Sequence, residues 1–145
     1  MARAVQKMGG MRIPPVRDFM TTSPRTIAAQ DTMAQAHRMM REARVRHLPV
    51  VDGDRLVGVV TAGDLHLMET LKDVDPEAIT VEEAMSQGAY AVTPDTLVDE
   101  VVAEMARHKY GCAVVASHGK VVGILTCVDV YRAFAELLHS AALRD

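Results

Sequence analysis

Two stretches decide the fold of this chain: Leu56-Val57-Gly58-Val59-Val60-Thr61-Ala62-Gly63-Asp64 and Val121-Val122-Gly123-Ile124-Leu125-Thr126-Cys127-Val128-Asp129. Each stretch runs from an apolar strand into the pattern Thr-x-x-Asp. Around them, residues 16–65 and 81–130 align without a gap at an offset of 65 residues. An internal repeat of this kind fixes the architecture before any single motif does. Two copies of one half-built unit predict a pseudo-twofold pair with two equivalent clefts, which favours a binding module over an enzyme.

Each copy has the same predicted order of elements, β-α-β-β-α. In the first copy we expect an extended segment at 26–27, a helix at 33–43 capped from residues 31–32, strands at 47–51 and 56–60 around an Asp-Gly turn, and a helix from Thr61 to residue 72. In the second copy we expect a strand at 90–92, a helix from residues 93–95 to 108, strands at 112–116 and 121–125, and a helix at 128–142. Neither small sheet covers its own apolar faces, so the two units must share a core.

The composition fits a small α/β (α+β) protein with an aliphatic interior. The chain has 145 residues, of which 49% are hydrophobic, with ten methionines and no tryptophan. Its net charge is −3, and the four basic residues that precede Asp18 leave the remainder more acidic still. Such a body is a poor partner for nucleic acid, because non-specific binding depends on neutralising phosphates with basic residues.

The predicted organisation is a basic tail at 1–13, a first repeat at 14–72, a linker at 73–80 and a second repeat at 81–142. No apolar run approaches the roughly 20 residues that a membrane span requires, and the first residues lack the apolar core of a signal peptide. The two cysteines, Cys112 and Cys127, have no metal-like spacing. We therefore expect a reduced, cytoplasmic protein without membrane association.

The repeated motifs resemble a known family. Arg46-His47-Leu48-Pro49-Val50-Val51 and the two Thr-x-x-Asp stretches, in register, are similar to a tandem pair of CBS domains, also called a Bateman module. The resemblance covers about residues 14–140. It implies a flat disc with two clefts and a regulatory ligand that contains adenosine, namely AMP, ADP, ATP or S-adenosylmethionine. It implies no required cofactor. The residue patterns themselves predict no metal site and no catalytic residue, since they contain no metal-ligand spacing and no catalytic motif.

The resemblance also assigns candidate ligand-binding residues. The Thr hydroxyl and Asp carboxylate of each motif hold ribose and phosphate, a role that falls on Thr61 with Asp64 and on Thr126 with Asp129. This chemistry is reasonable, because a carboxylate accepts two hydrogen bonds from a ribose diol and a helix start attracts phosphate. Arg46 is similar to a phosphate-binding basic residue of the family. The remaining candidates line the adenine or stack on it: Ile27, His47, Val92 and Thr93.

A purely structural interpretation stands beside this one. Thr-x-x-Asp is also nearly a capping box, which stabilises a helix without any ligand. Family members often carry a basic residue inside the motif, whereas this chain has Ala62-Gly63 and Cys127-Val128 there. Gly111 stands where the first repeat has Arg46. We therefore expect unequal clefts, with the site of Arg46, Thr61 and Asp64 the tighter one.

Three functional hypotheses follow. The first is a stand-alone CBS pair that senses an adenosine-containing ligand and signals to a partner protein. The alternative is an interaction subunit whose clefts stay empty. An enzyme is the third, but no nucleophile has a base at a suitable spacing. A metal site from the six histidines would need tertiary convergence. A redox role for Cys127 would rest on its position at a helix start, where the dipole favours a thiolate. The resemblance implies a homodimer, with candidate contacts on the predicted helices: Met39, Met40, Leu67, Leu71, Val101, Val102 and Met105.

Overall fold

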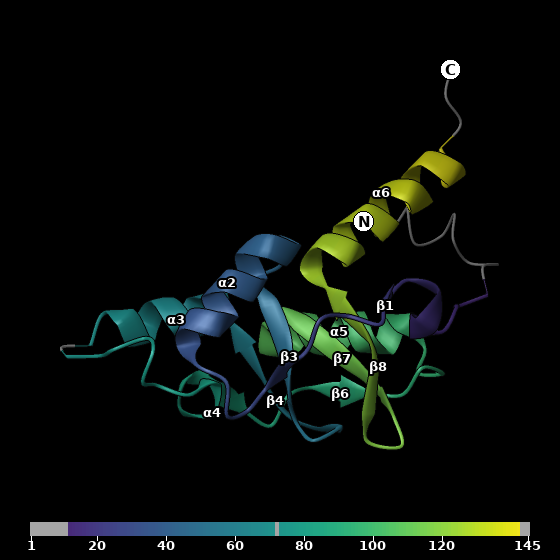
Figure 1. Cartoon of the computed structure of the whole chain (residues 1–145). Helices are drawn as coiled ribbons and strands as arrows, with labels where there is room; N and C mark the ends of the chain where they lie inside the picture. The colour runs from purple at the N-terminus through teal and green to yellow at the C-terminus, as the bar shows by residue number, and fades with distance from the viewer. Residues whose placement is uncertain (1–11, 72, 143–145) are drawn as a thin grey trace.

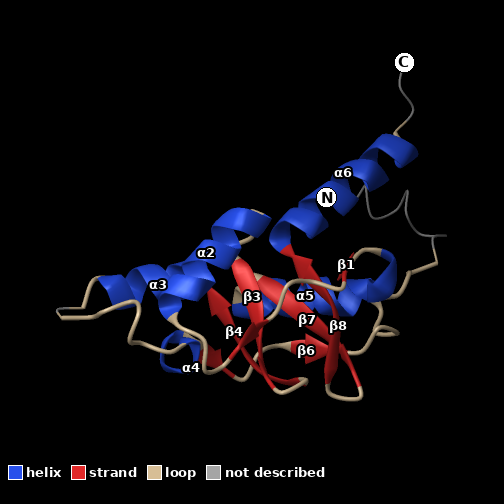
Figure 2. Cartoon of the chain, viewed as in Figure 1, coloured by secondary structure: helices blue, strands red, loops and turns tan. Residues whose placement is uncertain are grey.

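The computed structural model describes residues 12–71 and 73–142, which form two small sheets and the helices around them (Figure 1). The first repeat contains η1 (Val16–Asp18), β1 (Thr21–Thr22), β2 (Ile27–Ala28), α2 (Met33–Ala43), β3 (His47–Asp52), β4 (Arg55–Thr61) and α3 (Ala62–Glu69). The second contains α4 (Val81–Ala84), β5 (Ser86–Gln87), β6 (Ala91–Val92), α5 (Val98–His108), β7 (Cys112–Ser117), β8 (Lys120–Thr126) and α6 (Cys127–Ala141). The mixed α/β class and the repeated order of elements are confirmed (Figure 2).

The start of α5 differs from the prediction. The helix begins at Val98 and not at residues 93–95. The Thr96 amide donates to the Thr93 carbonyl at 3.1 Å, and the Thr93 amide donates to the Thr96 hydroxyl at 3.2 Å. These bonds close a turn, because threonine side chains satisfy local backbone groups as well as a helix does. Helix α5 therefore begins about one turn later in the sequence than predicted.

The two sheets exchange their edge strands. One sheet has the order β2-β3-β4-β5 and the other β1-β8-β7-β6. β1 comes from the first repeat but pairs with β8, where Thr21 lies opposite Ile124. β5 comes from the second repeat but pairs with β4, where Ser86 lies opposite Val59. Each strand has only two residues, which is too short for a hydrophobic pattern, and neither was predicted.

The exchange extends into the two hydrophobic cores. Val81, at the start of the second repeat, is fully buried in the core of the first, with Met33, Leu48 and Val60. Val16, at the start of the first repeat, is fully buried in the core of the second. Burying one valine side chain stabilises a fold by about 1.5–3 kcal/mol. Each repeat therefore completes its neighbour's core, as expected for units too small to fold alone.

A third cluster joins the two sheets at the seam. It consists of Val59 from β4, Cys112 and Val114 from β7, and Ile124 from β8. Beside it the two hairpins touch, since the Leu56 amide donates to the Gly119 carbonyl at 3.2 Å. The apolar cluster and the contact between the hairpins therefore both join the two sheets at the seam.

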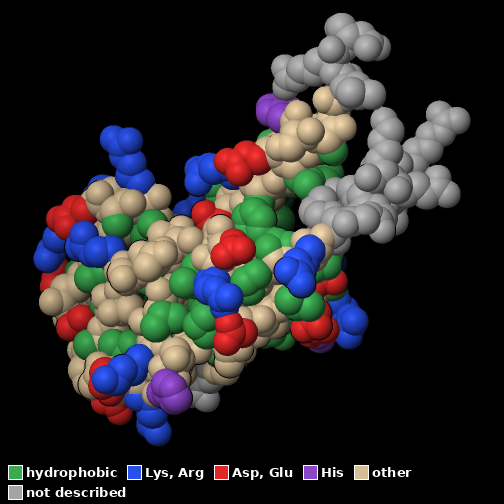
Figure 3. All heavy atoms as spheres, turned by 90° about the vertical axis from the view of Figure 1, so that its right-hand side faces the viewer, with side chains coloured by type: hydrophobic (Ala, Val, Ile, Leu, Met, Phe, Trp, Pro, Cys, Tyr) green, Lys and Arg blue, Asp and Glu red, His purple; other side chains and the backbone are tan. Residues whose placement is uncertain are grey.

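Helix α6 stands apart from the rest of the fold. It extends away from the body (Figure 1) and none of its 15 residues is buried. Hydrophobic side chains gather along it and at its base (Figure 3). By contrast, Met40, Val101 and Met105, predicted as dimer contacts, lie in the cores and are at most 7% exposed. That part of the dimer prediction is wrong, because the apolar faces of α2 and α5 are used within the chain.

Candidate ligand-binding site

The second Thr-x-x-Asp motif forms a complete capping box at the start of α6. The Asp129 amide donates to the Thr126 hydroxyl oxygen at 3.3 Å, and the Thr126 amide donates to Asp129 Oδ2 at 2.9 Å. Thr61 and Asp64 make the same reciprocal bonds at the start of α3, both at 3.0 Å. The capping interpretation therefore holds in both repeats, and it uses one carboxylate oxygen of each aspartate.

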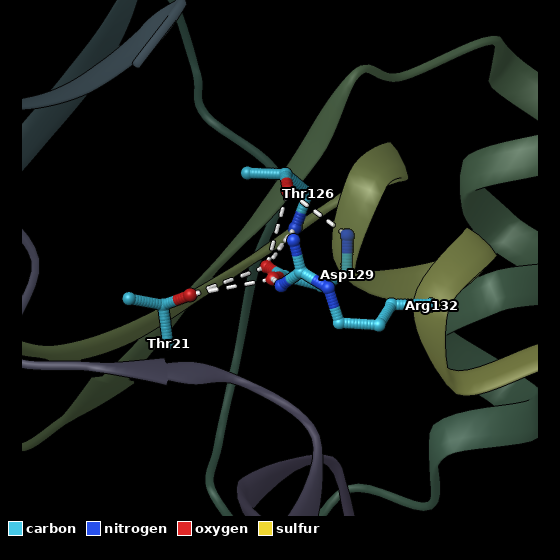
Figure 4. Close-up of polar contacts among 4 residues, drawn as sticks. All are labelled: Thr21, Thr126, Asp129 and Arg132. Atoms are coloured by element: carbon cyan, nitrogen blue, oxygen red, sulfur yellow. Dashed lines mark hydrogen bonds and ion pairs between the residues drawn. The ribbon is translucent and has the colours of Figure 1, made fainter. Parts of the chain in front are cut away.

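The other oxygen of Asp129 is held only by long contacts (Figure 4). The Thr21 hydroxyl lies 3.4 Å from Oδ1, and Nη1 of Arg132 lies 3.9 Å from it. Both distances exceed those of strong charge-assisted hydrogen bonds. The side chain of Asp129 is 11% exposed. The capping role of Asp129 is therefore compatible with ligand binding, because its Oδ1 remains able to accept hydrogen bonds from the diol of a ligand.

A cavity of about 580 Å³ opens beside this carboxylate, and we call it the Asp129 cavity. Its volume falls within the range of roughly 300–1,000 Å³ that is typical of small-molecule sites. The walls come from the β1–β2 segment, the end of α2, the start of β3 and the start of α6. The lining includes Thr21, Ser23, Pro24, Arg25, Arg44, Arg46, His47, Gly111, Thr126, Asp129 and Arg132.

Arg46 has a different setting from the one expected. The sequence groups it with Thr61 and Asp64, because all three belong to the first repeat. In the structure Arg46 lines the cavity of Thr126 and Asp129, which belong to the second. The reason is the seam: the start of β3 lies against the start of β7, so residues of one repeat border the motif of the other.

His47 marks the point where the two repeats meet. A Cβ atom on Gly111 would lie 2.5 Å from Nε2 of His47, so the imidazole occupies the space that a side chain at residue 111 would need. Burial lowers the pKa of His47, and the Arg46 charge lowers it further, although Asp64 opposes the shift. His47 therefore lines the Asp129 cavity as a neutral ring. Its pKa is also influenced by the carboxylate of Asp64, which belongs to the Thr-x-x-Asp motif of the first repeat.

The remaining candidates lie elsewhere. Ile27 is 2% exposed and packs in the first core; the residues of its segment that line the cavity are Ser23, Pro24 and Arg25. Val92 packs against the second core, and Thr93 is engaged in its turn with Thr96. The sequence prediction missed Arg25, Arg44 and Arg132. At the offset of 65 residues they align with Tyr90, Lys109 and Leu67, so the repeat shows a shared basic residue only at Arg44.

The second repeat carries different side chains at the positions that align with this part of the cavity. His108, Tyr110 and Tyr90 take the places of Ala43, Val45 and Arg25 in the repeat alignment. The three rings stack on one another, with centroids 5.3 Å apart for Tyr90 and Tyr110 and 5.1 Å apart for His108 and Tyr110. Aromatic stacking at such distances is stabilising. Aromatic rings therefore occupy the positions of the second repeat that hold Ala43, Val45 and Arg25 in the first.

Other kinds of site find little support in the described part of the chain. Among residues 12–71 and 73–142, no group of three or more His, Cys, Asp or Glu is placed to hold a metal ion. Burial raises the pKa of the Cys112 thiol to about 12, so it stays protonated at neutral pH. No helix in these ranges is long and apolar enough to span a membrane.

Known relatives share the repeat and the fold. The sequence pattern of the CBS domain matches residues 16–67 and 81–136. The chain is 33% identical over 146 residues to an inosine-5'-monophosphate dehydrogenase of Korarchaeum cryptofilum, of which it spans 27%. It is 29% identical over 121 residues to hypoxic response protein 1 of Mycobacterium tuberculosis, and this match covers 83% of the chain and 85% of that protein.

Solved structures of similar proteins contain adenosine derivatives. The CBS domain pair of protein MJ0100, solved with 5'-methylthioadenosine and S-adenosylmethionine, has a TM-score of 0.79 at 26% identity, covering 87% of this chain and 99% of that one. CBSX2, solved with AMP, has a TM-score of 0.73 at 26% identity, covering 86% and 98%. The CBS domain of a bacterial CNNM/CorC family Mg²⁺ transporter, solved with ATP, has a TM-score of 0.73 at 27% identity, covering 84% and 87%. This chain therefore belongs to the CBS domain family and carries two CBS domains in tandem.

Proposed function

We propose that the chain is a regulatory module that binds an adenosine-containing ligand in the Asp129 cavity and passes the bound state to a partner protein. The observation that carries this proposal is Asp129, which lines a cavity of about 580 Å³ at a helix start and whose Oδ1 is held only by long contacts to Thr21 and Arg132. A carboxylate so placed accepts hydrogen bonds from the two hydroxyls of a ribose. The relatives solved with adenosine derivatives support the choice of ligand.

The mechanism we propose is linkage between ligand and arrangement of the repeats. Thr21 contacts Asp129 from β1, a strand exchanged between the repeats. A ligand that replaces this contact favours whichever arrangement of β1, β8 and α6 binds it better. The shift is limited by the difference in affinity between the two arrangements. No reacting group is required, so we expect no enzyme activity from this region.

We infer further that two chains pair through α6. Val128, Tyr131, Phe134 and Leu138 are between 41% and 68% exposed, and their spacing places them along one side of the helix. A groove of about 640 Å³ beside α6 is also lined by apolar residues, including Phe19, Val102 and Leu137. Large exposed apolar patches mark interaction surfaces. Such a dimer would place α6, which begins at the cavity, in the contact that reports ligand binding.

A thermal-shift panel tests the ligand proposal. The wild-type chain is screened with AMP, ADP, ATP, S-adenosylmethionine, NAD and GTP, next to Asp129→Ala and the matched variant Asp64→Ala. Both variants lose the same capping bond, so both are less stable without ligand. A ligand at 100 times its Kd stabilises the fold by about 2.7 kcal/mol. We expect an adenosine compound to shift the wild type and Asp64→Ala but not Asp129→Ala. No shift with any compound would instead favour an interaction subunit with empty clefts.

A further inference from the structure

The Asp129 cavity has an unusual concentration of positive charge. Four guanidinium groups line it, from Arg25 in the β1–β2 segment, Arg44 and Arg46 between α2 and β3, and Arg132 in α6. Asp129 is the one carboxylate of its lining. The chain as a whole has a net charge of −3, so the cluster does not reflect its general composition.

Three of these arginines lack a neutralising partner within the described chain. Arg132 lies 3.9 Å from Asp129 Oδ1. Among residues 12–71 and 73–142, no carboxylate lies within ion-pair distance of Arg25, Arg44 or Arg46. Like charges gathered in one place destabilise the empty fold, and a bound anion removes that cost.

The second repeat provides an internal comparison. The positions that correspond to Arg25, Arg46 and Arg132 hold Tyr90, Gly111 and Leu67, and only Lys109 keeps the charge of Arg44. The same fold is therefore built without three of these arginines. This argues that the charges serve the cavity and not the fold.

We propose that the Asp129 cavity selects ligands with a chain of at least two phosphates, and that Arg25, Arg44 and Arg46 determine this specificity. This proposal rests on the proposed function and narrows its ligand to a nucleoside di- or triphosphate. Guanidinium groups bind phosphate through paired N–H donors. One terminal phosphate carries a charge of about −2 at most, so a longer phosphate chain neutralises the three guanidinium groups better than a monophosphate does. S-adenosylmethionine has a cationic sulfonium where the phosphates would lie, so the arginines disfavour it.

Calorimetry at two salt concentrations tests the selection. ATP and ADP are compared with AMP, adenosine, S-adenosylmethionine and inorganic tripolyphosphate, on the wild type, Arg25→Gln and Arg44→Gln. Lys109→Gln is the matched control for Arg44→Gln, because both residues have left-handed backbones at helix ends. Arg38→Gln controls for the loss of one exposed arginine elsewhere on α2.

We expect ATP to bind at least tenfold more tightly than AMP, and each cavity variant to weaken ATP binding by about tenfold, since each variant removes charge-assisted hydrogen bonds to phosphate. Adenosine binding should change less than twofold, and salt should weaken ATP more than adenosine. Equal affinity for AMP and ATP, or equal losses in Lys109→Gln and Arg44→Gln, would overturn the selection while the proposed function stands. If tripolyphosphate binds as tightly as ATP and adenosine does not bind, the cavity is an anion site that does not recognise adenosine. That result would contradict the proposed function. Binding of none of these compounds would overturn both.

Discussion

The imidazole of His47 fills the space above Gly111, with Nε2 lying 2.5 Å from the position that a Cβ atom on residue 111 would take. Gly111 corresponds to Arg46 in the repeat alignment. The first repeat therefore has Arg46 at this position, whereas the second has a residue without a side chain. The ring of His47 occupies the space that a side chain at residue 111 would need. This single difference breaks the symmetry of the two clefts at the seam.

Gly58→Ala should destabilise the fold more than Gly111→Ala. A Cβ on Gly58 would lie 2.9 Å from the backbone oxygen of Ser86, in the exchanged strand β5, which cannot move alone. We expect a loss of about 1–3 kcal/mol, as for other overpacked sites. Chemical denaturation measures it. The control is Gly63→Ala, whose nearest neighbour is 3.6 Å away and whose helical position favours alanine. Equal stability of all three variants would argue against the exchange of strands.

The stability of the fold should depend on pH through His47. Its pKa is lowered in the folded state by burial and by Arg46. The unfolded chain therefore takes up a proton first, near pH 6.5, and stability is lost as the pH falls from there through the folded-state pKa. We expect a lower Tm at pH 5 than at pH 7.5, and a smaller difference in His47→Gln. A wild type that gains stability on acidification through this range would contradict the burial of a neutral ring.

Thr61→Ala and Thr126→Ala should cost similar stability but differ in binding. Each removes the N-cap of a helix, which is worth about 1 kcal/mol. Only Thr126 lines the Asp129 cavity. We therefore expect similar losses in denaturation midpoint, and weaker nucleotide binding in Thr126→Ala alone. If both variants bind the nucleotide as the wild type does, the motif serves only as a cap.

Substitution of the exposed apolar residues of α6 should separate the proposed dimer. In the double variant Tyr131→Ser with Phe134→Ser, residues that are 68% and 57% exposed lose their apolar surface. Their exposure means that the fold of each chain should lose little. Light scattering at micromolar concentration should give a dimer for the wild type and a monomer for the variant. Ala135→Ser, an exposed change on the same helix, is the control, and a monomeric wild type would refute the dimer.

The sequence predicted the elements well where hydrophobic periodicity was strong. The helix at 33–43 agrees with the structure because its buried residues recur at helical spacing. The strands that start at His47 and Cys112 agree because each is a short continuous apolar run that is buried. The start of α5 was wrong by one turn, since Thr93 and Thr96 bond to each other in a turn. β1 and β5 were missed because two residues carry no periodicity, yet they decide which repeat contributes to which core.

The structure brings four of the candidate site residues together, but in a grouping that differs from the expected one. The motif residues Thr126 and Asp129, and Arg46 and His47, do meet at one cavity. The repeat alignment could not show that Arg46 lies with the motif of the other repeat, because that depends on how the two sheets meet. Arg25 and Arg44 went unnoticed for a similar reason, since isolated arginines in loops carry no signal until the fold brings them together.

The most direct test of the account is the number of nucleotides bound per chain. Native mass spectrometry with ATP counts them on the wild type, Asp64→Ala and Asp129→Ala. Because four arginines line the Asp129 cavity, and the aligned positions of the other repeat keep only Lys109 as a basic residue, we predict one ATP per chain in the wild type and in Asp64→Ala, and none in Asp129→Ala. Two ATP molecules per chain, or loss of binding in Asp64→Ala with retention in Asp129→Ala, would contradict a single site at the Asp129 cavity.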